Sequence, residues 1–375
     1  MGLRVDMEKK EKPLYRKIAD ELRAMILDGS YANGRLPSDR WLTRHYSTSR
    51  PTITKAMREL ETEGAIIRRS GSGSFVNPTG LNTTHFVSIL IASVNDSEFF
   101  EPICSQIGES CQSLSLNLVW GEKKQFITVD KRQSIDEIIK HCKRQNVKGV
   151  FFIPAEDSGD CKAEMRNYDI SEALTKAGIA VILIDRDLGN FSSRSKYDLV
   201  GVDNFNAGYR QTQHLIKCGC KKILYVTHRE MVSSVQSRIV GMKTALGEPS
   251  ASGIKGKICI GDIDDEKFLQ LILSQKPDGI IARNDQTAVK IENRLLKAGV
   301  KIPEEIQIIS IDDANCIKTL KVPLTTLRQP VKFIGEEATR LMALRLNKDD
   351  SPPRQMLFDS TIVCRASTRR IGTKI

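Results

Sequence analysis

Residues 36–64 read LPSDRWLTRHYSTSRPTITKAMRELETEG, and this stretch decides how the first part of the chain folds. Ser38 is placed to accept a hydrogen bond at the start of a short helix that runs to about His45. After a polar turn, Ser49 is placed to cap a second helix, with Pro51 in its first turn, where a missing N–H group costs nothing. The stretch therefore predicts two helices joined by a tight turn.

The second of these helices has two different faces. Helical spacing places apolar side chains on one face, namely Ile53, Met57 and Leu60. It places polar and basic side chains on another face, namely Arg50, Thr54 and Arg58. A helix pair whose second member is polar and basic at its N-terminus suits the major groove of DNA.

The flanking sequence extends this unit on both sides. Apolar residues at intervals of four predict an earlier helix over residues 14–26. Downstream, residues 65–69 and 74–76 predict two strands around the glycine-rich turn SGSG, which is typical of a wing. Glycine lets the turn approach a sugar-phosphate chain closely, and Arg68 and Arg69 are placed to neutralise it.

The charge distribution agrees with a nucleic-acid partner. The chain has 375 residues with 57 Lys and Arg against 46 Asp and Glu, a net charge of +11. Residues 1–78 hold 15 basic and 10 acidic residues, so a disproportionate share of the excess lies in about a fifth of the length. A small basic module therefore precedes a larger, nearly neutral one.

The ordered segments LYRKIADELRAMILDG, LPSDRWLTRHYSTSRPTITKAMRELETEG and AIIRRSGSGSFV closely resemble the GntR-family winged helix-turn-helix over residues 13–76. The resemblance implies DNA binding, with Arg40 and Arg50 reaching guanine edges or phosphates. Pro51 and Thr54 depart from residues common in the family, so we expect a different base preference. The candidate DNA-contacting residues are Ser38, Arg40, Ser49, Arg50, Pro51, Thr52, Thr54, Lys55, Arg68, Arg69, Gly71, Ser72 and Gly73.

Beyond a polar stretch at residues 78–84, apolar strand-like runs alternate with helical stretches. The strand-like runs are at residues 86–92, 114–119, 149–153, 179–184, 222–227, 279–282 and 306–311. Such alternation predicts parallel sheets covered by helices, and the length favours two lobes. We therefore expect an N-terminal winged helix-turn-helix (α+β) plus a two-lobed α/β domain with parallel sheets. The expected boundaries are 9–77 for the DNA-binding domain, 78–84 for a linker and 85–375 for the two-lobed domain.

Ligands of open parallel sheets bind beyond the carboxyl ends of the strands. Carboxylates, amides, arginines and aromatic rings follow several of the predicted strands, and together they describe a sugar site. These residues are Asn95, Asp96, Phe99, Phe100, Asp185, Arg186, Asp187, Asn284, Asp285, Asp312 and Asp313. Some of them have plainer interpretations, because Asp285 can simply cap a helix and the segment 185–187 can be a solvated turn.

Residues 85–369 resemble the LacI-type effector domain, a fold shared with periplasmic sugar-binding proteins. The resemblance is carried by segments such as VGVDNFNAGYRQTQHLIKCGCKKILYV, SSVQSRIVGMKTAL, PDGIIARNDQTA and GVKIPEEIQIISIDDA. It implies a periplasmic-binding-protein-like cleft with Phe99 and Phe100 at a stacking position. Its other implied lining residues are Asp185, Arg186, Arg238, Asn284, Asp285, Asp312 and Gln329.

The combination of a GntR reader with a LacI-type sensor is similar to that of arabinose-responsive repressors, which implies a pentose or related monosaccharide as effector. One departure is the segment NPTGLNTTH at residues 77–85, which stands where LacI-type repressors carry a hinge helix. We therefore do not expect coupling through a folding hinge helix.

Signatures of catalysis are absent, since the sequence contains no GxGxxG after the first strand, no GxxxxGKS/T, no GxSxG and no HExxH. Nine cysteines without CxxC pairs or Cys/His metal spacing predict reduced thiols, no metal and no cofactor. No apolar run is long enough for a membrane helix, and the charged N-terminus has no secretory signal, so we expect a cytoplasmic protein.

We therefore expect a DNA-binding transcription regulator, a repressor and not an enzyme, that binds a palindromic operator as a homodimer under the allosteric control of a monosaccharide. Two alternatives stay open. The effector can instead be a purine or a phosphorylated sugar, or the protein can bind a sugar without binding an operator.

Overall fold

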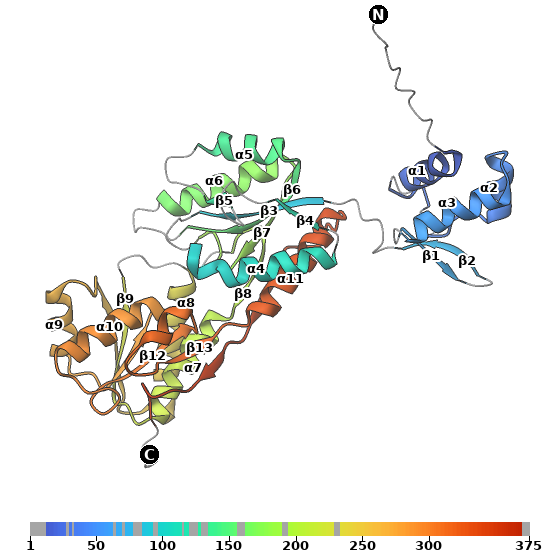
Figure 1. Ribbon diagram of the computed structural model, residues 1–375. Coiled ribbons are helices and arrows are strands. Elements are labelled where there is room, and N and C mark those ends of the chain that lie inside the picture. Colours follow the sequence, from blue (N-terminus) through green and yellow to red (C-terminus); the bar gives the residue numbers. More distant parts are fainter. Residues whose placement is uncertain are drawn as a thin grey trace, which may run out of the picture. The chain divides into compact units, whose positions relative to one another are not determined.

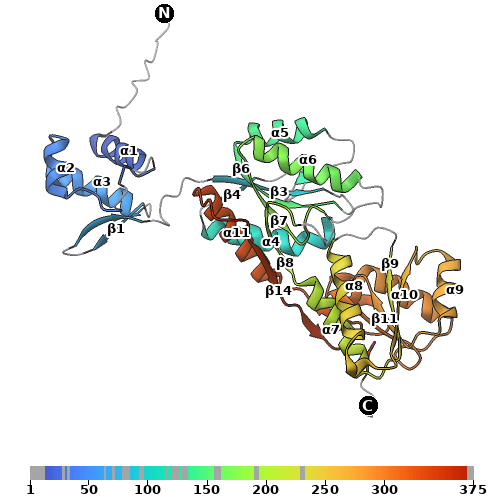
Figure 2. The ribbon, with the colours of Figure 1, turned by 180° about the vertical axis from the view of Figure 1, so that it is seen from behind.

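The structure, a computed structural model, describes residues 13–27, 30–31, 34–62, 65–69, 72–77, 85–92, 97–114, 116–119, 127–128, 134–155, 162–189, 194–228 and 233–369. The chain divides into two units, Met1–Thr84 and His85–Ile375 (Figures 1 and 2). The expected linker, residues 78–84, lies outside the described residues.

The first unit has the order expected of a winged helix-turn-helix. Its elements are α1 (Leu14–Leu27), α2 (Asp39–His45), α3 (Arg50–Thr62), β1 (Ile66–Arg69) and β2 (Gly73–Val76). The apolar stripe of each helix faces one core, which contains Ile18, Leu22, Leu42, Ile53, Met57 and Leu60. Because one face of α3 is buried in this core, its other face is free to meet a partner.

The N-lobe of the second unit is built on a seven-stranded sheet in which the described strands pair in parallel. Its strand order is β14-β8-β7-β6-β3-β4, with β5 paired to β3. The strands are β3 (His85–Ile91), β4 (Leu116–Val119), β5 (Ile127–Thr128), β6 (Val147–Ile153), β7 (Ala180–Ile184), β8 (Asp198–Val202) and β14 (Gln355–Phe358).

Helices cover both faces of this sheet. One face packs on α4 (Ser97–Ser113) and α11 (Val331–Leu346), and the other packs on α5 (Ile135–Arg144) and α6 (Lys162–Lys176) (Figure 1). Burial on both sides explains why the central strand β6, VKGVFFI, is apolar almost throughout.

The C-lobe repeats this arrangement on a six-stranded sheet of order β10-β9-β11-β12-β13-β15, in which β15 alone is antiparallel to its neighbour. Its strands are β9 (Lys222–Thr227), β10 (Lys255–Ile260), β11 (Gly279–Ala282), β12 (Gln307–Asp312), β13 (Thr325–Arg328) and β15 (Thr361–Val363). One face packs on α7 (Asn204–Lys217) and α8 (Ser233–Leu246), and the other on α9 (Glu266–Ser274) and α10 (Asp285–Lys297). Short 3-10 helices, η2 (Pro249–Ala251) and η3 (Asn315–Thr319), complete the lobe.

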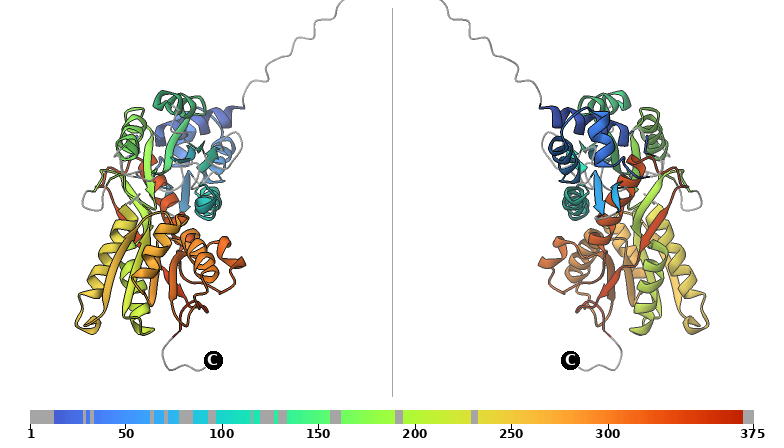
Figure 3. Two further views of the ribbon diagram at one scale, coloured as in Figure 1. Left: turned by 90° about the vertical axis from the view of Figure 1, so that its left-hand side faces the viewer. Right: turned by 90° about the vertical axis from the view of Figure 1, so that its right-hand side faces the viewer.

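The chain passes between the lobes three times: from β8 to α7, from β13 to α11 and from β14 to β15 (Figure 3). Because each lobe is completed by segments that follow the other, neither is a continuous stretch of sequence. The carboxyl ends of β7 and β8 in the N-lobe and of β12 and β13 in the C-lobe thus lie at cavities lined from both lobes.

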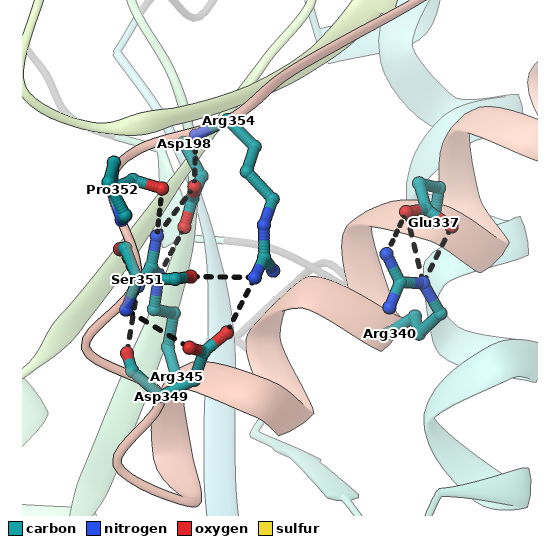
Figure 4. Close-up of polar contacts among 8 residues, drawn as sticks. All are labelled: Asp198, Glu337, Arg340, Arg345, Asp349, Ser351, Pro352 and Arg354. Carbon is teal, nitrogen blue, oxygen red and sulfur yellow. Dashed lines mark hydrogen bonds and ion pairs between the residues drawn. The ribbon is translucent and has the colours of Figure 1, made fainter.

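An ion-pair cluster ties the last N-lobe strand to the lobe (Figure 4). The guanidinium of Arg345 at the end of α11 donates two hydrogen bonds to the buried Asp198 carboxylate, at 2.6 and 2.9 Å. The backbone N–H of Arg354 donates to the same carboxylate at 2.7 Å. Asp198 begins β8, so this cluster fixes the segment that leads into the neighbouring strand β14.

Among the described residues, no helix is long and apolar enough to cross a bilayer. Eight of the nine cysteines are described; all eight are free, and only Cys316 and Cys364 are exposed.

Candidate nucleic-acid interface and effector cleft

The turn between α2 and α3 is fixed by its own hydroxyl groups. Ser38 accepts a hydrogen bond from the backbone N–H of Trp41 at 3.3 Å and so caps α2. Ser49 accepts from the backbone N–H of Thr52 at 3.4 Å, and the hydroxyls of these two residues lie 2.8 Å apart. These three predicted DNA contacts therefore also set the direction of the two helices.

The side chains around these caps form an exposed surface at the N-terminal ends of α2 and α3. Its members from the sequence analysis are Arg40, Arg50, Pro51, Thr54 and Lys55, all exposed. The Lys55 ammonium lies 4.2 Å from the centre of the Tyr15 ring, which orders this charge on the surface. Cations and hydroxyls grouped on the free face of α3 are suited to phosphates and base edges.

The two arginines of the wing, Arg68 and Arg69, have different environments in the structure. Arg68 donates to the Asp39 carboxylate of α2 at 2.6 Å, so it joins the wing to the helices. Arg69 is exposed instead, because successive strand residues point to opposite faces. Both arginines stay predicted phosphate contacts, and the charge of Arg68 is in addition paired with that of Asp39. Ser72 and Gly73 lie at the turn, Gly73 at φ 111°, whereas Gly71 lies outside the described residues.

On the N-lobe side of the cleft, two charged residues follow β7. Asp185 adopts φ 70°, and its carboxylate accepts a hydrogen bond from Arg186 Nε at 2.9 Å. Both side chains are at least nine-tenths buried. The Arg186 guanidinium lies 5.3 Å from the centre of the Phe100 ring in α4, so the predicted aromatic and charged residues do meet here. Asp96 and the side chain of Phe99 lie outside the described residues.

On the C-lobe side, Arg238 of α8 is buried and held by three groups. It donates to the hydroxyl of Tyr225 at 3.3 Å, to the side-chain oxygen of Asn204 and to the carbonyl of Arg283 at 3.4 Å. Burial opposes its charge, but the Tyr225 hydroxyl and the carboxylates of Asp312 and Asp185 outweigh this effect and raise the pKa of Arg238. Its guanidinium is therefore a fixed cation between two carboxylates from the two lobes.

Asp312 and Gln329 complete the cleft at the ends of β12 and β13. Burial raises the pKa of Asp312 well above its ordinary value, and the charge of Asp285 adds to this effect. Gln329 Nε2 donates to the Asp312 carboxylate at 2.7 Å, while Gln329 Oε1 is buried without a partner among the described residues. A buried acceptor of this kind requires a donor, which a ligand can supply.

Asn284 and Asp285 begin α10, and their side chains bind the protein itself. Asn284 Oδ1 caps the helix by accepting from the backbone N–H of Thr287 at 3.0 Å and from its hydroxyl at 2.7 Å. The fully buried Asp285 carboxylate accepts hydrogen bonds from Ser310, from Thr326 and from the backbone N–H of Ala314. Burial raises the pKa of Asp285 to about 6. Asp285 therefore positions the strands beneath the cleft, while Asn284 keeps its amide group beside a cavity.

Three cavities adjoin these residues. One of about 760 Å³ lies over the ends of β9, β10 and β11 and includes Arg283, Asn284 and His228. One of about 250 Å³ includes Asp185, Arg186, Asn204, Ser234 and Ser237, and one of about 400 Å³ includes Pro102, Asp312 and Gln329. The second and third are lined from both lobes, so a ligand there contacts both halves of the domain. In the part of the chain that is described, no group of three or more His, Cys, Asp or Glu side chains is arranged to hold a metal ion.

Known families match both units. Residues 14–76 match the bacterial regulatory proteins of the gntR family, and residues 212–368 match a periplasmic binding protein-like domain. The protein is a transcription regulator, not an enzyme. The expected fold class and the expected function class are thereby confirmed.

Relatives and solved structures resemble the regulator over most of its length. The arabinose metabolism transcriptional repressor of Halalkalibacterium halodurans is 22% identical over 382 residues, which cover 94% of this chain and 96% of that protein. A complex of the transcriptional regulator CelR with cellobiose has a TM-score of 0.62 at 19% identity and covers 88% of this chain and 100% of that chain. A LacI family regulator from Enterococcus faecium with bound ribose has a TM-score of 0.60 at 22% identity and covers 76% of this chain and 99% of that chain.

Several residues that line the regulator's cavities were missed by the sequence analysis: Asn204, Ser234, Ser237, Arg283 and His228. Asn204 follows β8, whose short sequence DLVGV was not recognised as a strand. Ser234 and Ser237 lie on α8. Ser234 is three residues before Ser237 and four before Arg238, and these spacings are the signal that places Ser234 beside each of them on the helix surface.

Proposed function

We propose that the regulator is a cytoplasmic repressor that binds a palindromic operator as a homodimer and releases or tightens it when a monosaccharide, such as arabinose, occupies the cleft between the lobes. The observation that carries the proposal is the buried group of side chains from both lobes, formed by Asp185, Arg186, Arg238, Asp312 and Gln329. Similarity to an arabinose metabolism repressor and to regulators with bound cellobiose or ribose supports the choice of a sugar.

The donors and acceptors of this cleft favour a neutral, hydroxyl-rich ligand. Gln329 Oε1 needs a donor, which a sugar hydroxyl supplies, and carboxylates such as Asp185 accept from hydroxyls as well. The charge of Arg186 is paired with that of Asp185. A phosphorylated sugar at this group of five residues would therefore be bound mainly by Arg238, so we favour an uncharged sugar there. The two cavities are also lined by Arg194, Arg328 and Lys332, and a phosphorylated sugar bound by these cations is the alternative.

The response follows from the three passages of the chain between the lobes. A ligand bound to groups from both lobes favours one angle between them, and this angle determines which placement of the two DNA readers of a dimer is favoured. A typical coupling free energy of about 1–3 kcal/mol would change operator occupancy roughly 5- to 150-fold.

A thermal-unfolding scan of the full chain with arabinose, fucose, xylose, ribose, galactose and rhamnose tests the sugar. At about 100 times its Kd a ligand adds roughly 2.7 kcal/mol, so one sugar is expected to raise the melting temperature visibly. The variant Gln329→Ala is expected to lose this shift, whereas Gln275→Ala, at the C-cap of α9, is the control that keeps it. No response to any sugar would contradict the monosaccharide proposal and favour a purine or phosphorylated sugar.

A further inference from the structure

The wing of the DNA-binding unit has an outer face that the sequence analysis did not assign. Arg35 pairs with Phe75 as an isolated antiparallel bridge, so the segment before α2 lies along β2, beside the two-stranded sheet of β1 and β2. Backbone hydrogen bonds from the N–H of Leu36 to the carbonyl of Ser74 and from the N–H of Val76 to the carbonyl of Gly34, at 2.9 and 2.7 Å, hold this segment. The segment and the hairpin therefore share two distinct faces.

Pairing register assigns the side chains to these faces. Phe75 lies opposite both Arg35 and Ile67, and directly opposed residues point to the same side of a sheet. Arg69 is two residues beyond Ile67, so it points to this side too. The other side is the buried one, with Leu36, Ile66 and Ser74 at 4%, 2% and 6% exposure. Both arginines therefore share an outer face, while Arg68 points inward to Asp39.

A single aromatic ring orders both outer arginines. The guanidinium carbons of Arg35 and Arg69 lie 5.8 and 5.3 Å from the centre of the Phe75 ring. Arg35 also donates to the carbonyl of Ser72 at 3.1 Å, beside Gly73 at the turn of the hairpin. Among the described residues neither guanidinium pairs with a carboxylate, so their cationic donors are held in place but not neutralised.

We propose that Arg35, Phe75 and Arg69 form a phosphate clamp in which two guanidinium groups, ordered by the ring between them, bind the DNA backbone beside the wing turn. This inference rests on the proposed function, because it assumes that the first unit binds DNA. Guanidinium donors match phosphate oxygens in pairs, and stacking reduces the conformational entropy lost on binding. Arg35 thus becomes a DNA-binding residue outside the helix-turn-helix and outside the wing hairpin itself.

The position and charge of the clamp favour DNA over a protein partner. It lies at the turn end of the wing, because Arg69 ends β1 and Ser72 and Gly73 follow the turn. The unit that carries it is the more basic part of the chain. A surface of two unneutralised arginines on an aromatic ring is attracted by a polyanion, and its contribution to binding falls as salt rises.

The test measures the affinity of the full-length regulator for a mixed-sequence DNA duplex of about three helical turns as a function of salt. Loss of one phosphate contact lowers the slope of log affinity against log salt by about 0.9. Because the proposed homodimer carries two copies of each residue, Arg35→Gln and Arg69→Gln are each expected to lower the slope by about 1.8, with roughly 30-fold weaker binding at 0.15 M salt. Arg16→Gln is the matched control, because Arg16 also lies 5.8 Å from an aromatic ring, that of Tyr15, but in α1.

Two further variants separate contact from folding. Phe75→Leu keeps an apolar side chain but removes the stacking ring, so it is expected to weaken binding while leaving the salt slope nearly unchanged. Arg35→Lys keeps the charge and is expected to retain the slope with reduced affinity. Unchanged slope and affinity in the double variant Arg35→Gln/Arg69→Gln, at an unchanged melting temperature, would overturn the clamp. Absence of salt-dependent DNA binding by the unsubstituted regulator would instead overturn the proposed function.

Discussion

Arg50 is the first residue of α3, and its side chain is exposed beside the Ser49 cap. An arginine that pairs with guanine contributes about 1–3 kcal/mol of discrimination against other bases. We therefore expect Arg50→Ala to weaken binding to the operator by this amount while binding to unrelated DNA changes much less. Competition binding measures the ratio. Arg16→Ala, on α1, is the control, and equal specificity in both variants would show that Arg50 does not contact the bases.

Asp285 gives a pH dependence whose sign is fixed by its burial. Its pKa is about 6 in the folded protein and about 3.9 in an unfolded chain, so the folded state binds the proton more tightly. The contribution of the protonated Asp285 carboxyl group to the free energy of unfolding is therefore fully present below pH 4 and is lost as pH rises through 6. The free energy of unfolding changes by about 3 kcal/mol over this range. Urea unfolding of Asp285→Asn and of the unsubstituted protein at pH 4.5 and 7 should therefore show the variant gaining relative stability at the higher pH. A difference that is independent of pH would contradict this prediction.

Residue types alone suggested the members of the candidate site, but not the contacts that each of them makes. Arg68 and Arg69 show how far a local pattern can go. Strand alternation predicts that the two side chains point to opposite faces. It does not predict the partner of Arg68, because Asp39 is 29 residues away in sequence. Asn284 and Asp285 are polar residues at a strand end, as a ligand site requires. Only tertiary contacts from Ser310, Ala314 and Thr326 show that Asp285 binds the protein itself.

Among the elements, α7 and α8 pack at unusually close range, and two glycines permit it. A Cβ atom on Gly208 would lie 2.6 Å from the carbonyl carbon of Arg238, and one on Gly241 would lie 2.7 Å from the backbone nitrogen of Tyr209. Both contacts are with backbone, so the helices must separate to admit a methyl group.

We therefore expect Gly241→Ala to destabilise the protein by about 1–3 kcal/mol or more and to displace Arg238 from the cleft. The effect on sugar affinity, measured by calorimetry, is expected to exceed that of the control Gly247→Ala, whose added Cβ would make only ordinary contacts of 3.4 and 3.5 Å. Equal sugar affinity in the two variants would show that the spacing between α7 and α8 does not affect sugar binding.

The cluster of Asp198 and Arg345 makes a second prediction at this scale (Figure 4). Asp198 is 3% exposed, and its loss would leave the largely buried Arg345 without its carboxylate partner. Asp198→Asn is expected to cost about 3–5 kcal/mol of unfolding free energy, because breaking one side of a buried pair leaves the other charge uncompensated. Glu337→Gln breaks the more exposed pair with Arg340 on the same helix and is expected to cost less than about 1 kcal/mol. Denaturant titration measures the free energy of unfolding of both variants. An equal decrease in the two would show that burial of the ion pair does not determine its contribution to stability.

The elements that the sequence predicted are those with strong local signals. Ser38 and Ser49 as caps predicted α2 and α3 within a residue or two, and long apolar runs predicted β6 and β7. The strand β10, KGKICI, is polar at one end because it is an edge strand, and β14 and β15 have three or four residues each. Their strand conformation comes from pairing with distant neighbours, which a local pattern does not contain.

At the scale of the whole molecule, the alternation of strands and helices predicted two parallel-sheet lobes, but not how the chain shares its elements between them. The last helix, α11, packs on the N-lobe although the preceding strand β13 belongs to the C-lobe. The residues 329–330 and 359–360 therefore connect the lobes as the segment before α7 does. These connections make the angle between the lobes a property of the whole domain, which a ligand in the cleft can set.

If that angle controls the DNA readers, the effect must be reciprocal. Whatever factor the sugar imposes on operator affinity, the operator must impose on sugar affinity, because both report one coupling free energy. Calorimetric titration of the full-length protein with the responsive sugar, with and without saturating operator DNA, measures the factor by which the operator changes sugar affinity. This factor is expected to lie between roughly 5- and 150-fold and to equal the factor by which the sugar changes operator affinity. At an operator concentration that Arg50→Ala no longer binds, this variant should have the same sugar affinity with and without operator DNA. A sugar that changes operator affinity while the operator leaves sugar affinity unchanged would mean that the sugar acts at a second site or on the oligomeric state, and that the cleft is not the sensor.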